Sequence, residues 1–124
     1  MFEEFKIKYL GIQPIGKVST NQLEGLIARE FPRYIDEIIL KFNSIKADNP
    51  NAINRISAAI LKLSNKDISK IDSYIEMSNN DCRDVLALAE YPRYSKLGFS
   101  DLNNKRMRTI YLEDWAEYSK WINE

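Results

Sequence analysis

Apolar residues recur every three or four positions along most of this chain, which is the spacing of one buried face of an α-helix. They stand at Leu23, Leu26, Ile27 and Phe31; at Ile35, Ile38, Ile39 and Phe42; at Ile53, Ile56, Ile60 and Leu63; at Ile68, Ile71 and Ile75; and at Met107, Ile110, Tyr111, Trp115, Tyr118 and Ile122. Residues 5–10 alternate like a strand, but a single strand would have nothing to pair with, so a helix or an extended arm is expected there. The pattern predicts an all-α, single-domain helical bundle of five to seven helices over residues 1–124, with short antiparallel helix hairpins.

Prolines and short polar runs predict where these helices break. Breaks are expected near Pro32, Pro50 and Pro92, because proline lacks an amide hydrogen and clashes with the preceding turn. Further breaks are expected at residues 64–66 and 78–80. Pro32 and Pro50 also suit the first position of the next helix, whereas the segment "SKLGFS" at residues 95–100 is expected to be a loop.

Polar residues predict where two of the helices begin. Ser19 and Gln22 have the spacing of a capping box, in which each side chain bonds the other residue's backbone amide. The last helix is expected to begin at Ser100 or Asp101.

The stretch from Val85 to Ala89 is apolar on every side. A helix with such a pattern is usually buried all round. We therefore expect this short helix deep in the core, with Leu86 and Ala89 at the centre of the bundle.

One pentapeptide pattern occurs twice: Glu, an aromatic residue and then Pro-Arg-Tyr, at residues 30–34 and 90–94. The apolar patterns around the two copies differ, so they are not an internal duplication. The favoured interpretation is a helix stop, in which proline halts the helix and arginine reaches its last carbonyl groups. The alternative is a partner-binding surface formed by Arg33, Tyr34, Arg93 and Tyr94, since Arg and Tyr are enriched at interaction hot spots.

The composition excludes several kinds of active site. The chain has 124 residues with 18 basic and 18 acidic side chains, no histidine and a single cysteine, Cys82. Without histidine there can be no Ser-His or Cys-His nucleophile and no His-ligated zinc. We expect no cofactor and lean against an enzyme. The chain shows neither a signal-peptide pattern nor the ~18 consecutive apolar residues of a membrane span, so a cytoplasmic location without membrane contact is expected.

A polar cluster of Asp81, Arg83, Asp84 and Glu90 is the main candidate for chemistry. Acids brought together can share a proton or a divalent metal ion, which makes a carboxylate-based enzyme or metal site the alternative function. The favoured interpretation is structural: negative charge at a helix start is stabilising, and Arg83 can neutralise its neighbours.

Two further surfaces are candidates for binding. Lys105, Arg106 and Arg108 form the one dense basic patch, which makes a nucleic-acid-associated regulator the second alternative, although the balanced charge makes nucleic acid an improbable partner. Trp121 lies about 240° around a helix from Trp115 at 100° per residue, so one buried stripe cannot cover both. Trp121, with Arg93 and Tyr94, is therefore the candidate interface.

From Ile56 to Ile122 the order of features resembles a group of short bacterial proteins of unknown function. The segments that carry the resemblance are "AAILKLSNKDISKIDSYIE", "DCRDVLALAEYP" and "EDWAEYSKWI". It implies an all-α protein of the bacterial cytosol and no activity. We predict a non-catalytic protein–protein interaction or regulatory module, such as an immunity-like protein or a small adaptor, whose partner is another protein or a second copy of the chain.

Overall fold

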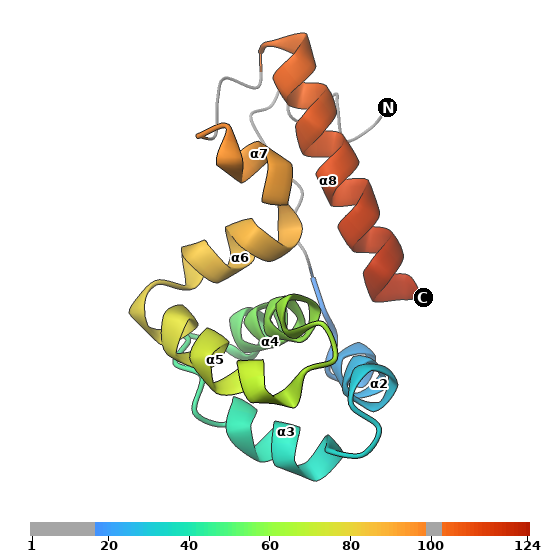
Figure 1. Cartoon of the computed structure of the whole chain (residues 1–124), viewed down its shortest axis with the longest axis vertical. Coiled ribbons are helices and arrows are strands. Elements are labelled where there is room, and N and C mark those ends of the chain that lie inside the picture. Colours follow the sequence, from blue (N-terminus) through green and yellow to red (C-terminus); the bar gives the residue numbers. More distant parts are fainter. Residues whose placement is uncertain (1–16, 99–102) are drawn as a thin grey trace. The chain divides into compact units, whose positions relative to one another are not determined.

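The structure is a computed structural model that describes residues 17–98 and 103–124. These residues form seven α-helices and one short 3-10 helix, and they contain no strand (Figure 1). In chain order the elements are α2 (Thr20–Glu30), α3 (Ile35–Phe42), α4 (Pro50–Ser64), η2 (Ile68–Lys70), α5 (Ile71–Asn80), α6 (Cys82–Glu90), α7 (Pro92–Lys96) and α8 (Lys105–Asn123). The all-α prediction is confirmed. The expectation for residues 5–10 lies outside the described residues.

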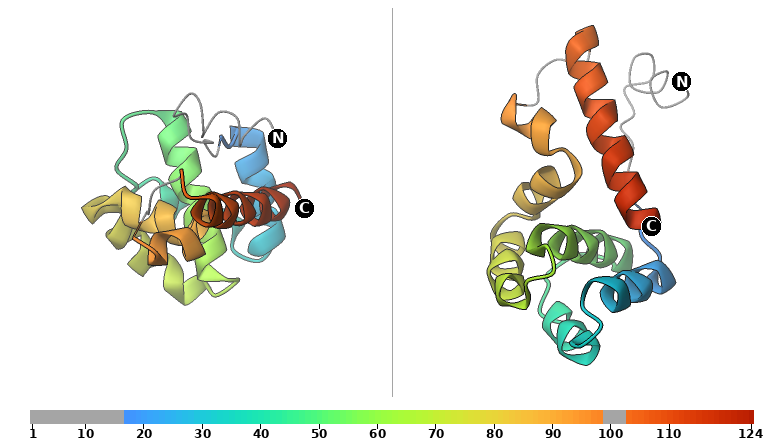
Figure 2. Two further views of the ribbon diagram at one scale, coloured as in Figure 1. Left: turned by 90° about the horizontal axis from the view of Figure 1, so that it is seen from above. Right: turned by 45° about the vertical axis from the view of Figure 1, so that its right-hand side comes forward.

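The described chain divides into two compact units, residues 17–89 and residues 90–124. In the first unit α4 lies between α2 and α5 and packs against both (Figure 1, Figure 2). The residues of α4 that are at most 2% exposed are Ile56, Ser57, Ala58, Ala59, Ile60, Leu61 and Ser64. The helix is thus buried on most of its circumference and forms the centre of this unit. A single domain over residues 1–124 stays a prediction.

The helix breaks fall where local chemistry places them. Ser19 Oγ accepts a hydrogen bond from the Gln22 backbone amide at 3.1 Å and so caps α2, as the capping box predicts. Asn49 Oδ1 accepts from the Ala52 amide at 2.9 Å and caps α4, with Pro50 in its first position. At the end of α4, Asn65 has φ 49°, a left-handed conformation typical of helix ends. The chain then turns back and α5 packs on α4.

Three expectations about helix boundaries were wrong. Pro32 was expected at the first position of a helix, but it lies in a turn, and α3 begins only at Ile35. Ser95 and Lys96, which were expected in a loop, are the last two residues of α7, and Pro92 occupies its first turn. The last helix begins at Lys105, because Asn104 caps it by accepting from the amides of Arg106 and Met107.

The burial of α6 was predicted correctly for one face only. Val85 and Ala89 are 0% and 1% exposed. They are four residues apart and share one side of the helix. Leu86 is only half-buried and Leu88 is 41% exposed, so the prediction that Leu86 lies at the centre of the bundle was wrong. An all-round apolar pattern permits full burial but does not require it.

Two buried serines of α4 differ in their hydrogen bonds. Ser57 Oγ donates to the Ile53 carbonyl at 2.7 Å, whereas Ser64 Oγ is buried without a hydrogen-bond partner among the residues that the structure describes. A buried hydroxyl without a partner costs about 1–3 kcal/mol of desolvation. Ser64→Ala should therefore leave the free energy of unfolding unchanged or raise it by up to about 1 kcal/mol.

Urea denaturation followed by circular dichroism measures this change, with Ser57→Ala as the matched control on the same helix. Ser57→Ala removes a satisfied hydroxyl and should give no gain. A loss of more than about 1 kcal/mol for Ser64→Ala would show that its hydroxyl is hydrogen-bonded after all.

Candidate interaction surface

Asp81 forms a local structural contact with Arg83. The Arg83 backbone amide and Nε both donate to Asp81 Oδ1 at 3.0 Å, and an outer guanidinium nitrogen donates to Oδ2 at 2.9 Å. These hydrogen bonds hold the pKa of the Asp81 carboxyl below its ordinary value. Asp81 thus caps the start of α6, in agreement with the structural interpretation of the cluster.

The carboxylate site predicted as an alternative function has no geometric support. Among residues 17–98 and 103–124, no three Asp, Glu or Cys side chains come together in a group that could hold a metal ion. Asp84 is exposed in the first turn of α6, while Glu90 is completely buried at its end. Cys82 is a free, partly buried thiol.

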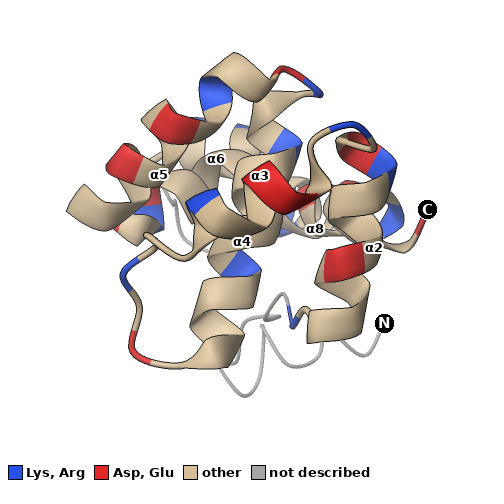
Figure 3. Ribbon diagram, turned by 90° about the horizontal axis from the view of Figure 1, so that it is seen from below, with Lys and Arg blue, Asp and Glu red and all other residues tan. Residues whose placement is uncertain are grey.

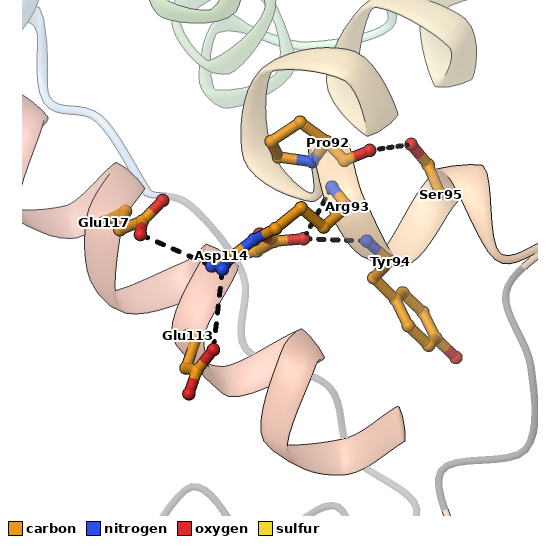
Figure 4. Close-up of polar contacts among 7 residues, drawn as sticks. All are labelled: Pro92, Arg93, Tyr94, Ser95, Glu113, Asp114 and Glu117. Atoms are coloured by element: carbon orange, nitrogen blue, oxygen red, sulfur yellow. Dashed lines mark hydrogen bonds and ion pairs between the residues drawn. The ribbon is translucent and has the colours of Figure 1, made fainter. Parts of the chain in front are cut away.

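The second Pro-Arg-Tyr copy is held by a buried carboxylate of α8. Asp114, whose side chain is 0% exposed, accepts from Arg93 Nε at 2.7 Å through Oδ1 (Figure 4). Its Oδ2 accepts from the backbone amides of Arg93 and Tyr94 at 3.0 and 2.8 Å. Tyr91, the residue before α7, provides no side-chain cap, so Asp114 supplies that cap from another helix.

The helix-stop interpretation expected Arg93 to reach the carbonyl groups at the end of α6. Arg93 binds Asp114 instead and does not reach them. Its guanidinium group also lies 3.5 Å from Glu113 and 3.4 Å from Glu117, on the same helix as Asp114 (Figure 4). The hydrogen bond with Asp114 is the main cause that raises the pKa of Arg93 above its ordinary value. The half-exposed Arg93 thus forms ion pairs with three acids of its own unit.

Tyr94 belongs to an aromatic core and is not an exposed contact residue. Its side chain is only 4% exposed and meets the Tyr111 ring edge to face, with ring centres 5.1 Å apart. The Tyr91 ring stacks on Tyr111 at 4.6 Å and on Trp115 at 6.3 Å. The Tyr94 side chain thus offers little surface to a partner, and its part in an interface stays a prediction. Trp121 is half-buried and stacks on Tyr118 at 5.7 Å, and its part in an interface stays a prediction.

The basic patch at the start of α8 is smaller than the sequence suggests. Lys105 and Arg106 are exposed, but Arg108 is only 7% exposed. Further along the helix the exposed charges include Glu113 and Glu117. These residues of α8 do not form the continuous basic face that nucleic-acid binding requires.

The first Pro-Arg-Tyr copy turns outward. Phe31 is 2% exposed and seals the end of α2, but Tyr34 is 43% exposed and Arg33 is exposed as well. Within the described chain, Arg33 forms no ion pair that corresponds to the pair between Arg93 and Asp114. The same residue types therefore pack inward in α7 and remain accessible before α3.

Exposed apolar side chains gather on and beside α3. Six large hydrophobic residues of the described chain are exposed, and four of them lie between residues 34 and 40. These four, which we call the α3 surface, are Tyr34, Ile35, Ile39 and Leu40, with exposed fractions of 43%, 36%, 42% and 69%. The other two are Leu88 and Leu97. Such concentration on one short helix marks the α3 surface as a candidate binding site.

Two of the four α3 residues that were predicted to be buried are buried. Ile38 and Phe42 are 0% and 6% exposed and hold the helix in its unit, but Ile35 and Ile39 are not buried. Lys41 fixes the helix further, because its Nζ donates to both carboxylate oxygens of Asp72 on α5 at 2.8 and 2.9 Å. This hydrogen bond is the main cause that raises the pKa of Lys41.

An open hollow of about 350 Å³ lies at the start of α3. Its lining residues are Pro32, Arg33, Tyr34, Ile35, Asp36 and Glu37. Acidic positions mark the beginning of the helix and a basic one its end (Figure 3). The α3 surface thus combines exposed apolar side chains with a polar recess beside them.

Comparisons with protein-family models, curated proteins and solved structures give no match to this chain. None of the helices among the described residues is both long and apolar enough to cross a membrane.

Replacing Asp114 should destabilise the α7–α8 contact. Asp114→Asn removes the charge that binds Arg93 and turns an acceptor into a donor beside two amide hydrogens. From the usual size of cap and charged hydrogen-bond losses we expect about 2–4 kcal/mol. Both tryptophans lie in α8, so their fluorescence during urea denaturation reports on this unit. Glu117→Gln, at a 70% exposed side chain, is the control and should cost less than about 0.5 kcal/mol. Equal stability of both variants would contradict the role given to Asp114.

The α3 surface should contribute little to folding. Leu40→Lys should change the free energy of unfolding by less than about 0.5 kcal/mol, as for other exposed positions. Ile38→Ala, at the buried side of the same helix, should cost about 2–5 kcal/mol. Thermal and urea denaturation of the two variants compare these values. A large loss for Leu40→Lys would mean that Leu40 packs within the fold.

Proposed function

We propose that this chain is a non-catalytic protein-binding module and that the α3 surface is its contact site. The observation that carries the proposal is the gathering of Tyr34, Ile35, Ile39 and Leu40 in solvent on and beside one short helix. A concentration of exposed apolar side chains on one element favours a protein partner that covers them.

The geometry of α3 favours recognition of the helix as a unit. Ile38 and Phe42 bury one side of it, and Lys41 ties it to α5, so its exposed side is presented on a fixed support. A fixed helix loses little conformational freedom on binding, which favours affinity. Helix surfaces of this kind bind in apolar grooves or against other amphipathic helices.

The remaining features of the chain agree with binding rather than catalysis. It has no histidine, and its acids and bases are equal in number. A bacterial, cytoplasmic protein that acts as an immunity-like protein or a small adaptor fits this character, and the resemblance to short bacterial proteins is part of the same proposal. The partner is a different protein, and a second copy of the chain is the competing occupant.

Paired variants test the proposal. Leu40→Lys places a charge on the α3 surface, and Leu88→Lys makes the same change at a 41% exposed leucine of α6. Wild type and both variants serve as bait in quantitative capture from an extract of the native host, and each captured protein is then purified and titrated against all three. We expect a partner that binds wild type and Leu88→Lys equally and Leu40→Lys at least about tenfold more weakly, the effect of a charge in an apolar contact.

A partner that binds all three equally would place the contact elsewhere on the chain and overturn the assignment to α3. Sedimentation of the same proteins shows whether the partner is a different protein or a second copy of the chain. Self-association that only Leu40→Lys abolishes would identify a second copy as the partner.

A further inference from the structure

The hollow beside the α3 surface has the chemistry of a site for a cationic side chain. Its lining residues include one with an aromatic ring, Tyr34, and two with carboxylates, Asp36 and Glu37. A Lys or Arg head group is attracted both to the face of an aromatic ring and to carboxylates. An anionic or purely apolar group would meet two acids there instead.

The acids of the hollow are only partly neutralised by the protein itself. Lys41, one turn along the helix, is attracted to Glu37, but its ammonium group donates to Asp72 at 2.8 Å. Arg33 lines the hollow, but it forms no ion pair with Asp36 or Glu37 within the described chain. One positive and two negative side chains leave the hollow with a net negative charge.

Helical spacing places the apolar and acidic residues of α3 next to each other. Leu40 follows Asp36 by four residues and Glu37 by three, so both acids border it on the helix surface. Leu40 is the most exposed large hydrophobic residue of the described chain, at 69%. A partner that covers Leu40 must therefore also approach two carboxylates.

We propose that the α3 surface binds an apolar, basic helix of another protein, with a lysine or arginine of that helix in the hollow. Apolar residues of the partner cover Ile39 and Leu40, and its cation lies against Tyr34 between Asp36 and Glu37. This inference rests on the proposed function and adds the chemistry of the partner. Charge complementarity of this kind raises the association rate and rejects partners of the wrong charge.

The same charges disfavour the competing occupants. A second copy that packed α3 against α3 across a twofold axis would bring Asp36 and Glu37 of both chains together, since such an interface uses the same surface twice. Anionic lipid headgroups and nucleic-acid phosphates would also be repelled by these acids.

A designed peptide pair tests the inference with the full chain. One fluorescein-labelled peptide is an amphipathic helix with leucine at every third or fourth position and lysine between; the other replaces each lysine by glutamate. We expect the lysine peptide to bind in fluorescence anisotropy and the glutamate peptide not to bind. Amide shifts in nuclear magnetic resonance spectra should be confined to residues near the hollow and α3.

Charge-matched double variants locate the contact. Asp36→Asn with Glu37→Gln removes two charges at the hollow, and Asp84→Asn with Glu24→Gln removes two exposed acids from α6 and α2. The first pair should weaken lysine-peptide binding about five- to twentyfold, as the loss of charge-assisted contacts does. The second pair should leave it unchanged, and circular dichroism checks that both proteins fold.

Three results would overturn the inference: equal binding of the two peptides, no binding of the lysine peptide, or an equal loss of binding in both double variants.

Binding of the natural partner distinguishes a failure of this inference from a failure of the proposed function. A captured protein that is lost with Leu40→Lys but retained by the Asp36 and Glu37 variant would uphold α3 as the contact site and reject the basic helix.

Discussion

The incomplete burial of α3 is the constraint on which the functional account depends. Five of its eight residues are large and apolar, and Ile35, Ile38, Ile39 and Phe42 have the spacing of one stripe. Only Ile38 and Phe42 of that stripe are buried, and Ile35, Ile39 and Leu40 remain accessible. Ile38 and Phe42 anchor this short helix in its unit, and Lys41 forms an ion pair with Asp72 of α5 at the surface. The apolar excess is then available for a partner.

A single buried carboxylate explains why two nearly identical motifs, with Phe31 in one and Tyr91 in the other, differ in their exposure. Asp114 accepts from the backbone of Arg93 and Tyr94 and from the Arg93 guanidinium, and this directs Tyr94 into the aromatic cluster with Tyr91 and Tyr111. The first copy lacks such a partner among the described residues, so Tyr34 stays in solvent. The surrounding helices, rather than the motif, decide which copy can bind another molecule.

Local chemistry accounts for the part of the fold that could be predicted from the sequence. Helical spacing, prolines and the Ser19 cap are properties of neighbouring residues, and they gave the all-α class and most helix breaks. The exposure of Leu86 and Ile39 and the cap that Asp114 gives to α7 depend on residues far away in the chain. Periodicity shows which residues are apolar but not how many of them the core has room to bury.

The sequence indicated part of the candidate site only through the alternative interpretation of the Pro-Arg-Tyr motif, a partner-binding surface. Arg33 and Tyr34 were part of the partner-binding alternative for the motif, and Tyr34 now lines the hollow. The acids around Arg83 and the pair Arg93 and Tyr94 attracted attention because charged and aromatic residues are common in functional sites. Asp81 binds Arg83, and Asp114 binds Arg93 and the Tyr94 amide, so these contacts serve the fold. One signal that could have marked α3 is its apolar content, which exceeds what a two-turn helix can bury.

The central claim is that Ile35, Ile39 and Leu40 are in solvent while Ile38 is not, and methyl spectra of the free monomer measure this directly. A soluble paramagnetic agent broadens methyl signals in proportion to their exposure. The account predicts strong broadening for Leu40, intermediate broadening for Ile35 and Ile39, and little for Ile38, which is 0% exposed. Protection of the Leu40 methyl groups equal to that of Ile38 would mean that the chain covers this helix itself, and it would contradict the assignment of the α3 surface as a binding site.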